Sequence, residues 1–420
     1  MKLVDAFDAI DVFAGNGWAV GLTALGLREF GVELDPWACA TRAAAGHVTV
    51  RADAAQLPLH RMAGKLRGLI ASPPCGTFSA AGKGEGIDDI PLLHEALDDL
   101  AAGRDTRARL TEACSDPRTP LVVEPLRYAM TIRPEWIALE QVPAVLPLWN
   151  HIARILDGLG YSTWTGIINA ADYGVPQTRR RAILIASRIR AASPPEPTHY
   201  DPRKGLRLWG TPWVSMAEAL GWDGALAAGV VNTRGERTTP GGNEFSPAGP
   251  SWALTEKTRS WKVVVGAGGF ASGYARGIDE PSPTIRQQTE SWVLRSGQSV
   301  AGEGRAERGL DEPAVSITGR ADLCAWSLRN NTQANSARRS LAEPAGTLFF
   351  GTRGNDVSWI GPDNGPVRIT VAEAAVLQSF PADYPFQGTK TQRFLQVGNA
   401  VPCRLATHIL SAATGIPVPS

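Results

Sequence analysis

A short apolar run followed by two prolines and a cysteine places the strongest constraint on how this chain folds. Residues 68–71 read Gly-Leu-Ile-Ala, a pattern typical of a buried parallel strand, and Ser72, Pro73, Pro74 and Cys75 follow directly. Proline has a fixed φ and no backbone N–H, so the strand must end there and the chain must turn stiffly. The pattern predicts an open α/β sheet with Cys75 at the carboxyl end of a strand, the edge where such sheets bind ligands.

Cys75 has two interpretations. A lone cysteine is often a small buried hydrophobic residue. Here, however, a rigid turn precedes it, and small residues with Gly82, Gly84 and Gly86 around Lys83 follow it. That composition suits a loop that closes over a site, so we interpret Cys75 as a presented nucleophile.

Composition narrows the compartment and the partners. The 420 residues are enough for two or three domains, and the net charge of +1 means that any basic surface for a nucleic acid must be local. The five cysteines form no C-x-x-C pair and no metal-ligand spacing with the six histidines, which predicts a reduced, cytoplasmic protein without a metal. Acidic residues at positions 5, 8 and 11 argue against a signal peptide, and no apolar run is long enough to cross a bilayer.

The first seventy residues have the pattern of a nucleotide-binding crevice. A predicted strand at residues 9–13 leads into a turn with Gly15 and Gly17, and residues 18–27 have helical spacing. The spacing Gly15-x-Gly17-x-x-x-Gly21 misses the dinucleotide fingerprint by one position, so a pyrophosphate cofactor is disfavoured. An ordinary tight turn is the alternative.

Acidic residues stand at or near the ends of three predicted strands. Residues 31–34 end in Glu33 and Asp35, about twenty residues beyond the glycine turn, where Rossmann-type folds place a ribose-binding carboxylate. Residues 48–51 lead to Asp53. Each acid alone could be a solvated strand terminus, but Asp11, Glu33 and Asp53 in register would outline one site.

Two further strands carry charged residues. Residues 137–142 form an apolar run that contains Glu140, and a buried carboxylate is costly unless it is paired or used. Residues 182–186 form another, preceded by three arginines. An arginine triplet is usually a solvated face, yet in an extended chain Arg179 and Arg181 share one side while Arg180 points away.

Beyond residue 190 the composition shifts to Ser, Pro, Gly, Thr and Trp, which indicates a linker and then a separate unit. Within it, Pro250, Pro281, Pro313 and Pro344 begin an irregular repeat of about 31 residues that predicts stacked units of a turn plus short strands. Each unit contains a tryptophan, which is either core or a contact residue: Trp261, Trp292, Trp326 and Trp359. Arginines scattered through the same region could supply phosphate and base contacts.

The chain closes with two recognisable signals. Thr370 followed by Glu373 predicts a helix start with a capping box. Further on stands Gly398-Asn399-Ala400-Val401-Pro402, which on its own could be a loop before a surface helix at residues 404–412.

Taken together, these motifs resemble the DNA cytosine-5 methyltransferase family. Pro74, Cys75, Phe78 and Ser79 match its Pro-Cys-x-x-Phe-Ser motif, and its Glu-Asn-Val, Gln-x-Arg-x-Arg and Gly-Asn-Ala-Val-Pro motifs appear in the family's order. Two positions depart from the pattern. Gln141 replaces the Asn, which puts a loop-steadying hydrogen bond in doubt, and Gly76 stands where many members have Gln.

The resemblance implies a Rossmann-like methyltransferase domain with a smaller, β-rich target-recognition domain. It implies S-adenosyl-L-methionine as cofactor, S-adenosyl-L-homocysteine as product, and no metal. Phe13 would lie against the adenine and sulfonium, Glu33 on the ribose and Asp53 near the adenine amine. The full set of implied cofactor residues is Asp11, Phe13, Ala14, Gly15, Gly17, Glu33, Leu34, Asp53, Ala54, Pro74, Asn399 and Val401.

The implied reaction requires the residue types that the motifs supply. Carbon 5 of cytosine is a poor nucleophile until a thiolate adds at carbon 6, so Cys75 would attack while Glu140 holds ring nitrogen 3 and the amine. Arg179 and Arg181 would reach the base, its phosphate and the thiol, and cationic neighbours would favour the thiolate. The base must be flipped out of duplex DNA, with Ser79, Lys83 and Arg179 as DNA contacts.

The expected domains are residues 1–190 with 391–420 for catalysis and residues 191–390 for recognition. We expect a monomeric modification enzyme that stands alone, without a nuclease-like extension. Two alternatives stay open: an RNA cytosine-5 methyltransferase of the same family, and a DNA-binding relative without turnover.

Overall fold

A seven-stranded sheet forms the centre of the computed structural model, which describes residues 6–78, 85–204, 210–220 and 370–419. It also describes short strand segments at 231–232, 244–245, 260–262, 293–295, 307–309, 327–330, 344–346, 357–360 and 366–368. The strand order is β3-β2-β1-β4-β5-β8-β6. The bounds are β1 Ala9–Val12, β2 Glu29–Glu33, β3 Val48–Arg51, β4 Gly68–Ala71, β5 Trp136–Gln141, β6 Ser162–Asn169 and β8 Arg180–Ser187.

The strand directions give the sheet its class. Strands β3, β2, β1, β4 and β5 run parallel, whereas β8 is antiparallel to both β5 and β6. Strands β1 and β4 pair side by side, Val12 with Ala71, which places the glycine turn and the Pro-Pro-Cys turn at one edge. The predicted α/β fold with a Rossmann-like sheet is confirmed.

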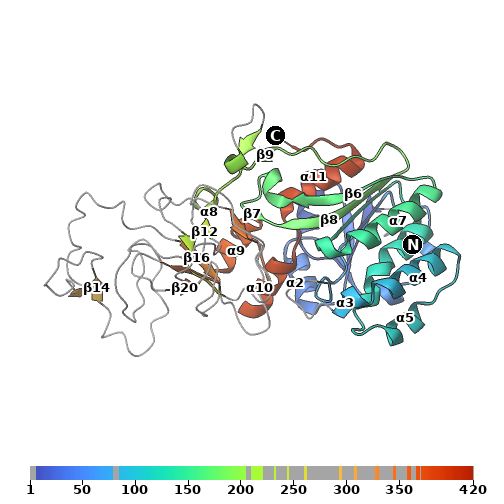
Figure 1. Cartoon of the computed structure of the whole chain (residues 1–420), viewed down its shortest axis with the longest axis horizontal. Helices are drawn as coiled ribbons and strands as arrows, with labels where there is room; N and C mark the ends of the chain where they lie inside the picture. Colours follow the sequence, from blue (N-terminus) through green and yellow to red (C-terminus); the bar gives the residue numbers. More distant parts are fainter. Residues whose placement is uncertain are drawn as a thin grey trace.

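Helices cover both faces of the sheet (Figure 1). One apolar core lies under α1 Gly17–Ala24 and α11 Cys403–Thr414, with Trp18, Leu22, Leu405 and Ile409 buried in it. A larger core lies on the other face under the helices α4 Ile90–Ala101, α6 Glu124–Ile132 and α7 Leu146–Gly158. The other described helices are α2 Pro36–Ala44, α3 Glu85–Asp88, α5 Arg107–Ala113, α8 Met216–Leu220, α9 Val371–Leu377 and α10 Lys390–Asn399.

Helix starts follow local capping chemistry. Thr370 accepts from the Glu373 backbone N–H while the Glu373 side chain accepts from the Thr370 N–H, so the predicted capping box is confirmed. Asp35 caps α2 by accepting from two backbone N–H groups. Helix α11 spans the expected residues 404–412 and packs one face inward, with Leu405 and Ile409 fully buried and Arg404 exposed.

In the repeat region each predicted unit has a strand at its tryptophan. Trp261 lies in β13 Ser260–Lys262 and Trp359 in β19 Val357–Ile360, while β14 Val293–Arg295 and β16 Ser327–Asn330 begin directly after the other two. Strands β13, β16, β19 and β20 Pro366–Arg368 form one sheet. The remaining short strands are β7 Gln177–Thr178, β9 His199–Tyr200, β10 Thr211–Pro212, β11 Val231–Asn232, β12 Glu244–Phe245, β15 Glu307–Gly309 and β18 Ala345–Gly346.

The fourth repeat reaches the strand that leads to the arginine triplet. Strand β18 pairs in parallel with β7, Ala345 opposite Gln177 and Gly346 opposite Thr178. Segments far apart in sequence also meet near α1 and α2. The Tyr384 hydroxyl donates to Asn16 at 3.5 Å and the Gln387 N–H donates to Thr41 at 2.8 Å. Trp292, Trp326 and most arginines of the repeats lie outside the described residues.

Candidate active site

The turn that presents Cys75 is held from two sides. The Trp18 indole N–H on α1 donates to Ser72 Oγ at 2.8 Å, and the Gln141 amide donates to the Pro73 carbonyl at 2.9 Å. Gln141 Oε1 also accepts from the Val142 N–H at 2.6 Å. The longer amide at position 141 therefore still fastens the loop, and the doubt raised by the missing Asn is removed. Trp18 and Ser72 were not singled out from the sequence, because nothing local marks their pairing.

Glu140 and Arg181 form an ion pair at the carboxyl end of β5. Glu140 lies opposite Ile183 in the β5–β8 ladder, so both charged side chains come from neighbouring strands. Arg181 Nε lies 2.8 Å from Glu140 Oε1, with the two side chains 6% and 8% exposed. Burial of a charged pair is costly unless its geometry is good or its function needs it, which marks the pair as a site candidate.

The arginine triplet alternates as predicted. Arg179 and Arg181 are 2% and 5% exposed, whereas Arg180 points to solvent. Arg179 Nη1 donates to the Gly398 carbonyl at 2.9 Å, which links the triplet to the Gly-Asn-Ala-Val-Pro segment 219 residues later. Burial lowers the pKa of Arg179 to about 9, with Arg181 adding to the shift. Arg179 therefore still carries its charge at neutral pH.

Burial decides the protonation of Cys75. It raises the pKa of the thiol above its ordinary value, Arg181 opposes the rise, and Glu140 adds to it. The sequence interpretation named Arg181 as the group that favours the thiolate, and its sign is correct. Its effect is smaller than that of burial, so the thiol is protonated at neutral pH in this structure.

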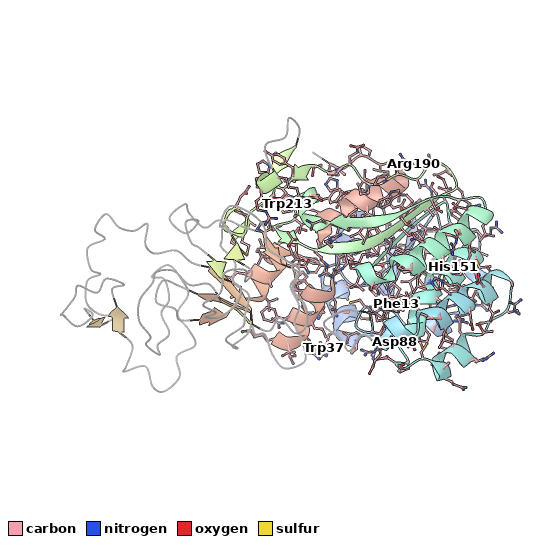
Figure 2. All side chains as sticks on the ribbon, in the orientation of Figure 1. Phe13, Trp37, Asp88, His151, Arg190 and Trp213 are labelled. Carbon is pink, nitrogen blue, oxygen red and sulfur yellow. The ribbon has the colours of Figure 1, made fainter. Side chains whose placement is uncertain are left out.

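The turn after β1 contains two glycines, and the space around a side chain differs at the two positions. A Cβ on Gly15 would meet no heavy atom within 4 Å, so space is open above the turn. A Cβ on Gly17 would lie 1.7 Å from the Val401 carbonyl oxygen. Gly17 therefore permits close approach of the closing segment, whereas its expected contact with the cofactor stays a prediction. Phe13 (Figure 2) starts the turn at a φ of 61°.

The next two acids lie where a ligand can reach them. Glu33 ends β2 and accepts from the Leu34 and Asp35 N–H groups at 2.8 and 2.7 Å. Leu34 is 62% exposed beside it. Asp53 is exposed after β3 and accepts from the Ala55 N–H at 2.9 Å.

The position of Asp11 along the sheet differs from the prediction that it lies level with Glu33. Asp11 pairs with Gly31, two residues before Glu33, so it lies two rows below the strand end instead of level with it. It is 0% exposed, and Arg42 Nη1 lies 3.6 Å from it. Burial raises the pKa of Asp11 well above its ordinary value, and Arg42 only partly offsets the rise.

Arg42 itself is a residue that the sequence did not reveal. It is fully buried beneath the glycine turn, donates to the Gly15 carbonyl at 2.7 Å and pairs with Glu29 at 2.5 Å. Asp11 thus belongs to a charged cluster under the turn. An arginine on an amphipathic helix normally faces solvent, which is why no local signal could have found it.

The remaining predicted residues divide into described and undescribed ones. Asn399 is exposed at the end of α10, and Val401 is buried against Gly17. Ser79 and Lys83 lie outside the described residues. Within the described part of the chain, no group of His, Cys, Asp or Glu side chains could hold a metal ion, and no helix is long and apolar enough to span a membrane.

A Rossmann-like sheet with a cysteine turn near a buried carboxylate–arginine pair is consistent with one class of protein, the methyltransferases of Rossmann-like fold. The family model described as C-5 cytosine-specific DNA methylase matches residues 7–92, 107–208 and 276–414. The chain belongs to that family. It is an enzyme of DNA cytosine-5 methylation, and the family implies S-adenosylmethionine as methyl donor.

Relatives of known description extend along most of the chain. It is 25% identical to the Type II methyltransferase M1.HphI of Haemophilus parahaemolyticus, over 96% of this chain and 85% of that protein. It is also 25% identical to the Type II methyltransferase M.DdeI of Desulfomicrobium norvegicum, over 94% and 86%. The structure of S. pombe Dnmt2 methyltransferase covers 97% of this chain and 98% of its own, at 11% identity and a TM-score of 0.50, a likeness of fold alone.

Proposed function

We propose that this enzyme methylates carbon 5 of a flipped-out cytosine in duplex DNA through a covalent adduct with Cys75. The observation that carries the proposal is the buried Glu140–Arg181 pair, 2.8 Å apart, next to the turn that presents Cys75. A carboxylate and a guanidinium in a fixed, water-poor edge can hold a pyrimidine ring and stabilise the charge that develops on it.

In the proposed first step the Cys75 thiolate adds to carbon 6 of the cytosine. Glu140 accepts from the exocyclic amine and delivers a proton to ring nitrogen 3, which neutralises the negative charge pushed into the ring as the carbon–sulfur bond forms. Arg181 keeps Glu140 oriented and favours the thiolate. After methylation, carbon 5 loses its proton and the bond to Cys75 breaks, which restores the aromatic ring.

The raised pKa of Cys75 gives the proposed step a pH dependence. Only the thiolate attacks, so kcat/KM rises with pH until the pKa of Cys75 is passed and then levels off. A flat profile from pH 6 to 9 with wild-type enzyme would contradict a protonated resting thiol.

The residues that follow β1, β2 and β3 are suited to bind the donor in this proposal. The open space above Gly15, the exposed Leu34 and the carboxylates of Glu33 and Asp53 can receive a nucleoside with its ribose on Glu33 and its amine near Asp53. When bound, S-adenosylmethionine supplies an electrophilic methyl group. Asp11 is fully buried and lies 3.6 Å from Arg42, so in the proposed site it acts through Arg42, which donates to the Gly15 carbonyl.

We further propose the division of labour expected from the sequence. Residues 1–190 with 391–420 carry the chemistry, residues 191–390 read the target, and Ser79, Lys83 and Arg179 contact the DNA. The enzyme acts as a monomer in the cytoplasm without a metal, since one flipped base needs one subunit.

The test is trapping on duplex DNA in which 5-fluorocytosine replaces cytosine, with tritiated S-adenosylmethionine and denaturing electrophoresis. Fluorine blocks the last elimination, so wild-type enzyme should form a stable radioactive adduct and Cys75→Ser should form none while still binding DNA. Cys39→Ser is the matched control, because Cys39 is also free but lies on α2, and it should form the adduct normally. Adduct on RNA alone, or binding without adduct on either, would overturn the proposal.

A further inference from the structure

The segment that follows β3 buries Ala54 and Leu59 in the core and leaves Asp53, Gln56 and Pro58 exposed between and beside them. Strand β3 is an edge strand, and Val48 and Val50 on it are 42% and 37% exposed. After it, Asp53 is exposed and caps the short helical turn η2 Ala54–Gln56. Two apolar anchors fix the position of the segment but do not set the orientation of each peptide group of the turn, which depends on the polar contacts that the turn makes.

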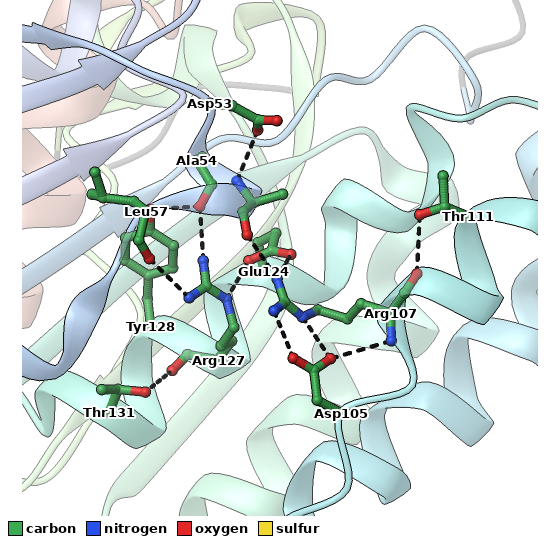
Figure 3. A network of polar contacts seen from close by, with 11 residues as sticks. Asp53, Ala54, Leu57, Asp105, Arg107, Thr111, Glu124, Arg127, Tyr128 and Thr131 are labelled. Atoms are coloured by element: carbon green, nitrogen blue, oxygen red, sulfur yellow. Dashed lines mark hydrogen bonds and ion pairs between the residues drawn. The ribbon is translucent and has the colours of Figure 1, made fainter.

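Such contacts come from the neighbouring helix α6. Arg127 Nη2 and the Tyr128 hydroxyl both donate to the Ala54 carbonyl, at 2.7 and 2.8 Å (Figure 3). Arg127 Nη1 also donates to the Leu57 carbonyl at 3.3 Å. Two residues of one helix thus fasten both ends of the turn.

A second arginine holds the middle of the turn. Arg107 Nη1 donates to the Ala55 carbonyl at 3.0 Å and to Glu124 Oε1 at 2.7 Å. Glu124 Oε2 accepts from Arg127 Nε at 2.6 Å, so one carboxylate orients both guanidinium groups (Figure 3). Arg107 also donates to the Asp105 carboxylate through Nε at 2.8 Å and through Nη2 at 2.6 Å.

The contribution of this cluster to the stability of the fold does not by itself explain the arrangement. Glu124 is 2% exposed, and a buried carboxylate between two arginines contributes little net stability compared with an apolar packing of similar volume. What the arrangement does provide is a fixed orientation of the backbone of this turn. Arg107 on α5 and Arg127 and Tyr128 on α6 draw three carbonyls of one turn toward these two helices, and Asp53 lies on the other side of the turn (Figure 3).

We propose that Arg107, Glu124, Arg127 and Tyr128, here named the Glu124 cluster, are positioning residues for the adenine end of the methyl donor. They act through the Asp53–Leu57 backbone and do not touch the donor themselves. The inference rests on the proposed function, because it needs Asp53 to lie near the adenine amine. The cluster makes the enzyme selective for a purine that carries this amine.

The experiment compares two ligands on the intact protein by titration calorimetry: S-adenosylhomocysteine, which has the amine, and S-inosylhomocysteine, which has a carbonyl there. Wild-type protein should bind the adenosyl ligand at least about tenfold more tightly, since a site built for a hydrogen bond rejects an analogue that lacks the donor. Glu124→Gln and the milder Tyr128→Phe, which removes one hydroxyl, should weaken adenosyl binding about threefold to tenfold and reduce the preference between the two ligands.

Arg104→Met is the matched control. Arg104, in the loop between α4 and α5, pairs with Asp99 of α4 at 2.6 Å, but it is 64% exposed and makes no bond to the turn in the described structure. It should leave both affinities unchanged. A second readout is kinetic: Tyr128→Phe should raise the KM for S-adenosylmethionine and leave kcat at saturation unchanged.

The outcomes separate the inference from its premise. The positioning role is overturned if Glu124→Gln and Tyr128→Phe lower the affinity for both ligands equally, or if neither variant changes the affinity for the adenosyl ligand. In both cases the donor site itself stays intact. If wild-type protein binds both ligands equally, the placement of Asp53 fails and the inference fails with it. Wild-type protein that binds neither ligand refutes the proposed donor site itself.

Discussion

Replacing Gly15 and Gly17 by alanine should have opposite consequences, although the two glycines are one residue apart. In Gly17→Ala the new Cβ would lie 1.7 Å from the Val401 carbonyl oxygen and 2.8 Å from its carbon. Both are backbone atoms, so no side chain can rotate away, and α1 must separate from the closing segment by on the order of 1 Å. We expect a loss of about 3 kcal/mol, at the upper end for overpacking.

Gly15→Ala is the matched control. No heavy atom lies within 4 Å of the added Cβ, and Gly15 is absent from the residues with positive φ, so stability should change by less than about 0.5 kcal/mol. The added methyl does, however, occupy the space proposed for the donor. We therefore expect Gly15→Ala to lower the affinity for S-adenosylhomocysteine about tenfold or more while the protein stays folded.

The assay is thermal unfolding followed by titration calorimetry on the three proteins. A loss of about 3 kcal/mol corresponds to a Tm lower by roughly 6–12 °C for a domain of this size. Gly17→Ala with a wild-type Tm would refute the close packing of Val401 on the turn. Gly15→Ala with wild-type affinity would show that the donor does not use the space above the turn.

Three further predictions test the surroundings of the site. Gln141→Ala should lower kcat about tenfold to a hundredfold with little change in the KM for DNA, whereas Gln141→Asn should retain most activity in the same assay. Burial lowers the pKa of His408 from 6.5 to about 4, so its contribution is complete above pH 6.5 and is lost as pH falls toward 4. Wild-type protein should then lose about 1–3 kcal/mol more than His408→Leu between pH 7.5 and 4.5 in urea unfolding, and equal losses would contradict the burial effect. Arg42→Met leaves Asp11 and Glu29 buried without their cation, so urea unfolding at pH 7.5 should show a loss of about 3–5 kcal/mol; a loss below 1 kcal/mol would mean that both acids are already neutral.

The structure also shows two kinds of paired arginine. Arg181 pairs with Glu140 at the carboxyl end of β5. Arg127 pairs with Glu124 and donates its remaining N–H groups to backbone carbonyls. Under the proposals above, the first pair acts on the reacting base and the second shapes the wall of the donor site.

The sequence by itself determined the features that depend on a few neighbouring residues. The end of β4 follows from Pro73 and Pro74, the start of α9 from the Thr370 capping box, and the exposure of Arg180 from alternation along an extended chain. The class of fold followed as well, because a strand, a glycine turn and a helix follow one another near the start of the chain.

Only the tertiary structure decided which residues meet across long stretches of chain. Gly17 lies against Val401, Arg42 lies under the glycine turn, and Asp11 sits two rows below the strand end that it was expected to share. These contacts depend on the register of the strands and on which helix covers which face of the sheet. Neither can be predicted from the pattern of a short stretch of sequence. The sequence could propose which groups do the chemistry, but burial, which raises the pKa of Cys75, exists only in the folded chain.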